Sequence, residues 1–311
     1  MTIELLKIGA RGSPLSLAQT SLVARMLEEA NPGLKTEIVP IKTTGDKMRE
    51  VSLAQIGGKG VFVKEIEEAL LSGKVDLAVH SAKDVPAQLP DGLTLAAVPQ
   101  RADFRDTLVT RRPGGLEALA EGAVVGTSGL RRQAQLLALR PDLKIAPIRG
   151  NIESRLNKVA TEVEATLLAA AGLDRLGLNP ANGQPLSPEI MLPSPGQGTL
   201  ALEARLTDLE ILETVQAVNH QPTYVCLAAE RGFLSRLGAG CQLPVAALAR
   251  IEGAVMTLEG LIASLDGRRT VREVRTGELD SAEGAANFGK MMATRLLEKG
   301  GTEIMKEAGL I

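Results

Sequence analysis

The sequence predicts an α/β protein with two similar lobes joined by crossing linkers, followed by a small α+β domain. Three observations support this prediction. Short apolar strands alternate with amphipathic helices over about two-thirds of the chain, two Pro- and Gly-containing seams interrupt the alternation, and the last third changes to strands followed by a helix. A chain of 311 residues is long enough for about two to three domains.

The first lobe opens with a strand over Leu5 to Ala10. Ser13-Pro14 predicts the start of a helix, because serine is a good N-cap and proline suits the first helical position. A strand over Leu34 to Ile41, a helix through Ile66 closed by Gly73, and a strand over Val75 to His80 follow. This βαβ rhythm predicts a mostly parallel sheet.

The second lobe repeats the rhythm, with strands predicted over Ala123 to Gly126, Leu143 to Ile148 and Ala165 to Ala171. The seams that flank it are Pro99 to Arg105 and Leu192 to Gly198, and we expect the first lobe to resume after the second seam. The predicted domains are 1–99 with 199–218, then 100–198, then 219–311.

The last third begins with an apolar-periodic helix through Phe233. Strands are predicted over Val245 to Arg250, Met256 to Ser264 and Thr270 to Arg275, and a final helix over Ala282 to Lys299. Asp266-Gly267 is a hairpin signal between the second and third of these strands. Strands followed by a helix predict a small α+β domain.

Composition excludes several classes of protein. A net charge of −2 argues against a nucleic-acid partner, and no run approaches the about 20 apolar residues of a membrane helix. The N-terminus lacks the features of a signal peptide, so a cytoplasmic protein without a membrane partner is expected. Two cysteines exclude a disulfide framework. With 2% aromatic residues and no Trp, a stacking platform is hard to build, so a ligand would be held by charge and backbone.

Cations, hydroxyls and glycines follow the predicted strands. Ligands of open α/β sheets bind beyond the carboxyl ends of the strands, so these residues predict one cleft lined with arginine. They are Arg11, Gly12, Ser13, Ser81, Lys83, Thr127, Ser128, Arg131, Arg132, Arg149, Gly150, Asn151, Arg155, Gly172 and Arg175. Arginine pairs with carboxylates in bidentate fashion, so the set predicts a carboxylate-rich polyanion. Each arginine taken alone fits a solvated or helix-C-terminal charge better than a ligand-binding residue.

Three other features each allow two interpretations. Asp84 is the one acid among these basic groups; it fits an acid/base carboxylate, but on residue type alone a turn residue before Val85-Pro86 is the stronger interpretation. Cys241, in a loop without periodicity, fits a nucleophile or attachment point as well as a small buried turn residue. Gly57 to Gly60 fits a lid carrying Lys59 or a plain loop.

No metal site is predicted, because the two histidines and two cysteines do not show metal-ligand spacing. His80 is better interpreted as a buried, hydrogen-bonded side chain, and Cys226 as a core residue. Nor does the sequence contain a Ser-His-Asp signature, a P-loop or a G-x-G-x-x-G motif.

These residues, in this order, closely resemble the hydroxymethylbilane synthase (porphobilinogen deaminase) family over the whole chain. No single segment is decisive, but the ordered set is specific. The matching segments are Ile8 to Leu15, Gly57 to Gly60, His80 to Pro86, Gly126 to Ser128 with Leu130 to Gln133, Arg149 to Asn151 with Arg155-Leu156, Ala170 to Leu173 with Arg175 to Gly177, Pro195 to Gly198, and Glu230-Arg231 with Gly240-Cys241 and Pro244.

The resemblance implies an enzyme that joins four porphobilinogen molecules head to tail and releases ammonia at each step, giving the linear tetrapyrrole hydroxymethylbilane. It implies two lobes of the type II periplasmic-binding-protein kind and a dipyrromethane cofactor bound by a thioether to Cys241 in the third domain. Asp84 matches the catalytic aspartate, placed to stabilise a cationic azafulvene. A small-molecule substrate and a monomer are expected.

The resemblance also assigns the strand-end residues to ligands. Besides Cys241, the cofactor-binding positions are Ser81, Lys83, Asp84, Thr127, Ser128, Arg131, Arg132, Arg149, Gly150 and Arg155. The substrate-binding positions are Arg11, Ser13, Gln19, Lys59, Arg149, Arg155, Arg175 and Gln197. The acetate and propionate groups of each pyrrole explain why arginines dominate both sets.

The sequence departs from the family pattern at four places. The family usually has Leu at Ala82, a small polar residue at Gly129, Gly-Thr at Glu153-Ser154, and Tyr-Asp-Ala at Val163 to Ala165. These changes affect bulk beside the catalytic segment and a hydroxyl contact to the cofactor, and leave Asp84 and Cys241 unchanged.

Two rival functions fit part of the sequence. A non-catalytic, two-lobed anion-binding or sensor protein explains the arginines but leaves Asp84 and the Cys241 loop without a role. A transferase with an ordinary cysteine thioester would need an activating base, and no histidine stands near Cys241 in the sequence.

Overall fold

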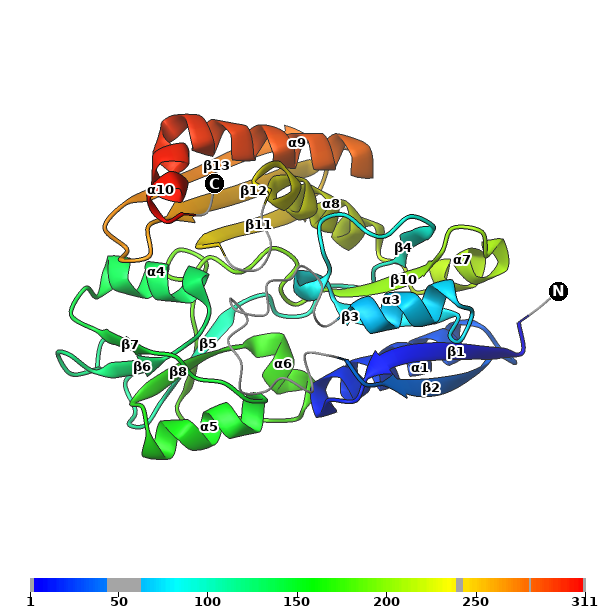
Figure 1. Ribbon diagram of the computed structural model, residues 1–311, viewed down its shortest axis with the longest axis horizontal. Coiled ribbons are helices and arrows are strands. Elements are labelled where there is room, and N and C mark those ends of the chain that lie inside the picture. The colour runs from blue at the N-terminus through cyan, green and yellow to red at the C-terminus, as the bar shows by residue number, and fades with distance from the viewer. Residues whose placement is uncertain (1–2, 44–62, 239–242, 280, 310–311) are drawn as a thin grey trace. The chain divides into compact units, whose positions relative to one another are not determined.

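The computed structural model describes residues 3–43, 63–238, 243–279 and 281–309 (Figure 1). The chain divides into two compact units, one of residues 1–102 with 199–224 and the other of residues 103–198 with 225–311. None of the helices within the described ranges is both long and apolar enough to cross a membrane.

The first unit is built on a five-stranded sheet with the order β2-β1-β3-β10-β4. Its strands are β1 (Leu5–Arg11), β2 (Lys35–Ile41), β3 (Leu77–Ser81), β4 (Leu93–Ala97) and β10 (Leu200–Arg205). Helices α1 (Pro14–Ala30) and α7 (Leu209–Gln216) bury their apolar residues against one face. Helix α3 (Lys64–Leu71) packs Ile66 and Leu70 against the other face, at Ala78.

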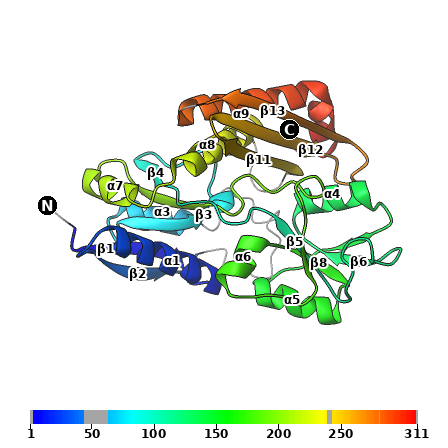
Figure 2. The same cartoon turned by 180° about the vertical axis from the view of Figure 1, so that it is seen from behind.

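The second unit contains a five-stranded sheet with the order β7-β6-β8-β5-β9. Its strands are β5 (Asp106–Thr110), β6 (Val124–Gly126), β7 (Lys144–Ala146), β8 (Ala165–Ala169) and β9 (Gly183–Pro185). Helix α4 (Leu130–Leu139) packs on one face. Helices α5 (Ile152–Thr161) and α6 (Ala170–Arg175) pack on the other, as Figures 1 and 2 both show.

Both five-stranded sheets contain one reversed strand, so the predicted mostly parallel pattern holds with one exception in each. β10 pairs antiparallel with β3 and β4, and β5 pairs antiparallel with β8 and β9. Each reversed strand follows one of the seams and enters its sheet from the opposite direction. The beginning of a reversed strand therefore lies beside the carboxyl end of its neighbour, as the pairing of Asp106 with Ala169 shows.

Several predicted boundaries are wrong in detail. The strand predicted over Ala165 to Ala171 ends at Ala169, because the backbone turns into α6 at Ala170. The strand predicted over Leu143 to Ile148 shortens to β7, since only three residues pair with β6. Strands β4, β5, β9 and β10 and helix α7 were not predicted, because their short apolar runs carry little periodicity.

The second unit also holds a three-stranded antiparallel sheet, β11-β12-β13, which confirms the predicted α+β region. Its elements are α8 (Gln221–Arg236), β11 (Val245–Glu252), β12 (Val255–Ala263), β13 (Thr270–Glu278), α9 (Ala282–Leu296) and α10 (Thr302–Glu307). Residues Leu297–Gly301 form a π-helical turn, and Gly300 with φ 111° ends the helix predicted to reach Lys299. The predicted Asp266-Gly267 hairpin turn is present, with Gly267 at φ 72°.

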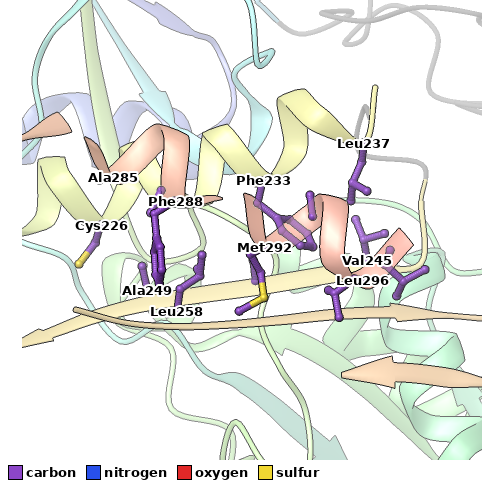
Figure 3. Packing of buried hydrophobic residues seen from close by; sticks show 14 of the residues in the cluster. Cys226, Phe233, Leu237, Val245, Ala249, Leu258, Ala285, Phe288, Met292 and Leu296 are labelled. Carbon is purple, nitrogen blue, oxygen red and sulfur yellow. The ribbon is translucent and has the colours of Figure 1, made fainter. Parts of the chain in front are cut away.

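Strands β11 and β12 of this sheet pack residues of both faces against buried clusters of the second unit. Phe233 of α8 and Phe288 and Met292 of α9 pack on one face (Figure 3). Ala246 and Leu261 on the other face pack with Ala134 of α4. This sheet is therefore joined to the neighbouring lobe through a continuous core.

Helices α8 and α9 approach closely at two glycines. A Cβ at Gly289 would lie 1.9 Å from the carbonyl oxygen of Ala229, and one at Gly232 would lie 2.1 Å from that of Ala286. Both obstacles are backbone atoms, which cannot move aside as a flexible side chain can. The crossing therefore requires glycine at both positions.

Replacing Gly289 with alanine should force α8 and α9 apart and lower the free energy of unfolding by about 3 kcal/mol, the upper range for overpacking a core. Urea denaturation of Gly289→Ala measures this loss. Gly277→Ala is the matched control, because its Cβ would meet Phe288 at an ordinary 3.6 Å. Equal unfolding free energies for the two variants would contradict the proposed close crossing.

Candidate active site

The first unit places six of the predicted site residues around the ends of β1 and β3. Arg11 ends β1, and Ser13 caps α1 by accepting a hydrogen bond from the Ser16 amide at 3.3 Å. Gln19 lies on the buried face of α1. Ser81 ends β3 and leads directly into a 3₁₀ turn over Ala82–Asp84, which carries Lys83.

The turn that carries Asp84 is fixed through its backbone. The amide of Ala82 donates to the carbonyl of Thr199 at 3.0 Å, and the amide of Val85 donates to the carbonyl of Ala82 at 3.3 Å. Ala82 and Val85 are buried, whereas Asp84 is exposed. The backbone is thus held by its apolar neighbours while the carboxylate of Asp84 remains open to a ligand.

The second unit centres on Asp106, which the sequence pattern did not predict as a site residue. Its fully buried carboxylate pairs with Arg131 Nη1 and with Arg132 Nη2, both at 2.7 Å. Gln197 Nε2 donates to the same carboxylate at 3.0 Å. Because β5 is reversed, its first residue reaches the edge where the parallel strands end. One signal in the sequence could have identified Asp106. It is an acidic residue directly after the first seam, in a chain whose strand ends carry many arginines.

The two arginines keep Asp106 ionised inside the protein. Complete burial by itself raises the pKa of a carboxyl, but the charges and hydrogen bonds of Arg131 and Arg132 hold the pKa of Asp106 well below its usual range. Burial conversely lowers the pKa of Arg131, against the attraction of Asp106. Arg131 also donates to the carbonyl of Leu192 at 2.8 Å, which ties the second seam to this ion pair.

Two neighbouring turns are linked beside this ion pair. Ser128 Oγ donates to the carbonyl of Ile148 at 2.8 Å, and Thr127 Oγ1 accepts from the Gly129 amide at 3.2 Å. Gly150 has φ 111° and leads to Asn151, which caps α5 by accepting from the Ser154 amide at 2.8 Å. These bonds bring the turns that carry Arg132 and Arg149 together at the starts of α4 and α5.

Positive charge accumulates at this edge of the sheet. Burial is the main reason why the pKa of Arg155 is lowered, and the charges of Arg132 and Arg149 lower it further. Burial also lowers the pKa of Arg175 to about 10, and its buried Nε makes no hydrogen bond within the described ranges. A buried arginine whose charge is disfavoured by two neighbouring arginines belongs to a site whose electrostatics improve when an anion binds.

Two predicted site residues, Lys59 and Cys241, lie outside the described residues. The four departures from the family pattern fall within the described residues. Ala82 is buried, Glu153 lies in the first turn of α5, and Val163 is buried. Gly129 is the N-cap of α4 with φ −87°, and a Cβ there would meet nothing closer than 3.7 Å, so a serine would fit without strain.

The fold and these residues define an α/β protein with strand-end arginines suited to a polyanion. Its sequence matches two family models, the porphobilinogen deaminase dipyrromethane cofactor binding domain over residues 6–213 and the porphobilinogen deaminase C-terminal domain over residues 224–298. The chain belongs to the porphobilinogen deaminase family.

Full-length relatives agree with this assignment. The porphobilinogen deaminase of Alkaliphilus metalliredigens is 45% identical over 97% of this chain and 95% of its own length. That of Geobacter sulfurreducens is 46% identical over 99% of this chain and 96% of its own length. Among solved structures, the periplasmic VFT2 domain of Bordetella pertussis BvgS aligns with 69% of this chain and 86% of its own, at 15% identity and a TM-score of 0.40.

The residues of the second unit fit the dipyrromethane cofactor that the family model names. Arg132, Arg149 and Arg155 mutually raise the local positive potential, and Arg175 keeps a buried donor atom without a hydrogen bond among the described residues. The starts of α4 and α5 add backbone N–H donors. Such a donor set suits the carboxylate side chains of a pyrrole chain.

Replacing Asp106 with asparagine should lower the free energy of unfolding by about 3–5 kcal/mol, because it leaves a buried guanidinium without its counter-charge. Urea denaturation at pH 7 and at pH 5 should give the same loss. A carboxyl with a depressed pKa keeps its stabilising charge until the pH falls below the ordinary pKa of aspartate.

The control for this experiment is Asp266→Asn, which removes an exposed charge beside Arg268, keeps the Oδ1 acceptor for Ser264 and the Arg268 amide, and should change unfolding little. A fully stable Asp106→Asn protein would show that the ion pair does not hold the strand ends in place.

Proposed function

We propose that the protein is a hydroxymethylbilane synthase, which condenses four porphobilinogen molecules head to tail, releases ammonia at each step and yields the linear tetrapyrrole hydroxymethylbilane. The observation that carries the proposal is the gathering of Arg132, Arg149 and Arg155 at the starts of α4 and α5, where burial and then the charges of Arg132 and Arg149 lower the pKa of Arg155. Family membership over nearly the whole chain supports the same reaction.

The arginines recognise the substrate by its acid side chains. Each porphobilinogen carries an acetate and a propionate, which match the planar donors of arginine. We assign substrate binding to Arg11, Ser13, Gln19, Lys59, Arg149, Arg155, Arg175 and Gln197, and cofactor binding to Ser81, Lys83, Asp84, Thr127, Ser128, Arg131, Arg132, Arg149, Gly150 and Arg155. Asp106 holds the guanidinium groups of Arg131 and Arg132 in place for this role.

Asp84 is the proposed catalytic residue. When porphobilinogen loses ammonia, the remaining azafulvene is electrophilic and positively charged. A carboxylate near the pyrrole N–H stabilises that cation and assists the proton transfers. The exposure of Asp84, on a turn whose backbone is held by Thr199, is what this role requires.

The dipyrromethane cofactor supplies a primer to which substrate units are added. We propose that Cys241 holds it through a thioether, in the connection between α8 and β11. In this proposal residues 1–99 with 199–218 carry the catalytic aspartate, residues 100–198 bind cofactor and substrate carboxylates, and residues 219–311 carry the attachment cysteine. We further propose a cytoplasmic monomer.

A non-catalytic anion-binding protein is not favoured. It would use the same arginines but would need neither an exposed aspartate on a fixed turn nor Cys241. The assignment to the family of a named enzyme supports the catalytic function instead.

Intact-protein mass spectrometry tests the attachment. The purified protein should carry an adduct of two pyrrole units, and Cys241→Ser should lack it. Cys226→Ser is the control, because Cys226 is buried in the core of the second unit. An active protein at its bare sequence mass would refute the primer, and an ordinary thioester would predict an adduct only during turnover.

Replacing Asp84 with alanine should lower the rate of ammonia release from porphobilinogen by at least about 100-fold, the scale of acid–base and electrostatic contributions. The fold should be retained, because the side chain is exposed. Asp91→Ala, at another exposed turn of the first unit, is expected to react normally. Near-normal ammonia release from Asp84→Ala would exclude the catalytic role.

A further inference from the structure

Three ionisable side chains are buried together in the first unit, beneath the strand end that carries the proposed catalytic turn. His80 Nε2 lies 3.0 Å from Glu203 Oε2, and their side chains are 4% and 0% exposed. Glu67 of α3 is also buried. Neither the binding of substrate carboxylates nor the proposed role of Asp84 uses any of the three.

The sheet places these side chains on one face. β3 and β10 pair with His80 opposite Ala201 and Ala78 opposite Glu203, so His80 and Glu203 are diagonal neighbours. Ala78 on this same face packs against Ile66 and Leu70 of α3. The helix that covers the pair therefore brings Glu67 to it.

The cluster contains more acid groups than its single histidine can balance. Burial and the charge of Glu203 raise the pKa of Glu67 to about 7, the charge of His80 lowers it, and that of Glu68 raises it. The Oε1 atoms of Glu67 and Glu203 are buried and make no hydrogen bond within the described ranges. A neutral Glu67 beside the hydrogen-bonded Glu203–His80 pair satisfies these surroundings best.

Other charged groups are present on the strands packed under α3. Arg11 ends β1, whose alternation places it on the same face as Gly9, and a Cβ at Gly9 would touch Ile66 of α3. Arg205 of β10 pairs with Asp76 and Asp208 at the opposite end of the strand. No group of three or more His, Cys, Asp or Glu residues among those described could hold a metal ion, so the cluster is not a metal site.

The cluster is connected to the proposed catalytic turn both along the chain and across the sheet. His80 is followed by Ser81 and the Ala82–Asp84 turn, and the amide of Ala82 bonds to Thr199, the residue before β10. Glu203 lies on β10 itself, and Arg11 ends the neighbouring strand. A change in the charge of the cluster therefore acts on both strands that fix the turn.

We propose that Glu67, His80 and Glu203 form a buried ionisable cluster that positions the Ser81–Asp84 turn, and that the turn is correctly placed only while Glu67 is neutral. This rests on the proposed function of Asp84. Ionisation of Glu67 would put a second carboxylate charge beside Glu203 in a buried site, loosen α3 from β3 and β10, and release the turn. The three residues are positioning residues, since none of them touches the substrate.

The sign of the pH dependence follows from the raised pKa. In the unfolded chain Glu67 ionises near its ordinary pKa of 4.5, whereas in the folded protein it ionises near pH 7. The folded state consequently loses stability as the pH rises through this interval, and above pH 7 Glu67 is charged in both states. Turnover should decline as the folded group ionises.

The pH profile of porphobilinogen turnover by the holoenzyme tests the proposal. In Glu67→Gln, whose amide imitates the neutral acid, the alkaline decline of kcat should move up by at least about one pH unit, while KM stays within about twofold. Glu37→Gln, an exposed change on β2 of the same sheet, should follow the wild-type profile. Superimposable profiles for wild type and Glu67→Gln would overturn the proposal.

Histidine resonances give a second readout that needs no turnover. The chain has two histidines, so ¹⁵N-histidine labelling of the holoenzyme gives two sets of signals, and His220→Gln identifies those of His80. The His80 signals of wild type should show a transition that follows the ionisation of Glu67 near pH 7, and Glu67→Gln should lose that transition. A His80 transition unaffected by Glu67→Gln, or absent from wild type, would refute the cluster. A normal His80 result without porphobilinogen consumption would instead refute the proposed function.

Discussion

The strand ends of the second unit depend on the buried carboxylate of Asp106, which two arginines share. Its burial disfavours charge, and the guanidinium groups of Arg131 and Arg132 make the ionised form stable there. The same ion pair joins the start of β5 to the start of α4 and, through Gln197, to the second seam. Arginines that would otherwise be mobile are thereby given fixed positions, which the recognition of a carboxylate-rich chain requires.

The reversed strands explain why acids and bases meet at the same edge in each unit. In the second unit, β5 brings Asp106 to the ends of the parallel strands. In the first unit, β10 brings Glu203 alongside β3, where it meets His80. Asp106 is thus held by two arginines of α4 and Glu203 by His80 of β3, and each of these two carboxylates lies beside a turn that carries proposed ligand-binding residues.

Scarce aromatic residues do not limit the site. The family cofactor and the proposed substrate carry several carboxylates, and backbone amides with arginines recognise these without stacking. Two of the four phenylalanines serve packing instead: Phe233 and Phe288 fill the core between α8, α9 and the three-stranded sheet. Close approach of the two helices at Gly232 and Gly289 completes that core with small residues.

The sequence by itself determined the α/β class, most of the central strands, the Ser13 cap, the Gly267 hairpin and the family, because these depend on local periodicity, turn chemistry and ordered motifs. It also indicated which strand ends carry arginines. Only the tertiary structure decided that β5 and β10 are reversed, and therefore that Asp106, Glu203 and Glu67 are buried beside cations or one another. Strand direction and burial arise from pairing between residues far apart in the chain, and no local pattern of side chains encodes them.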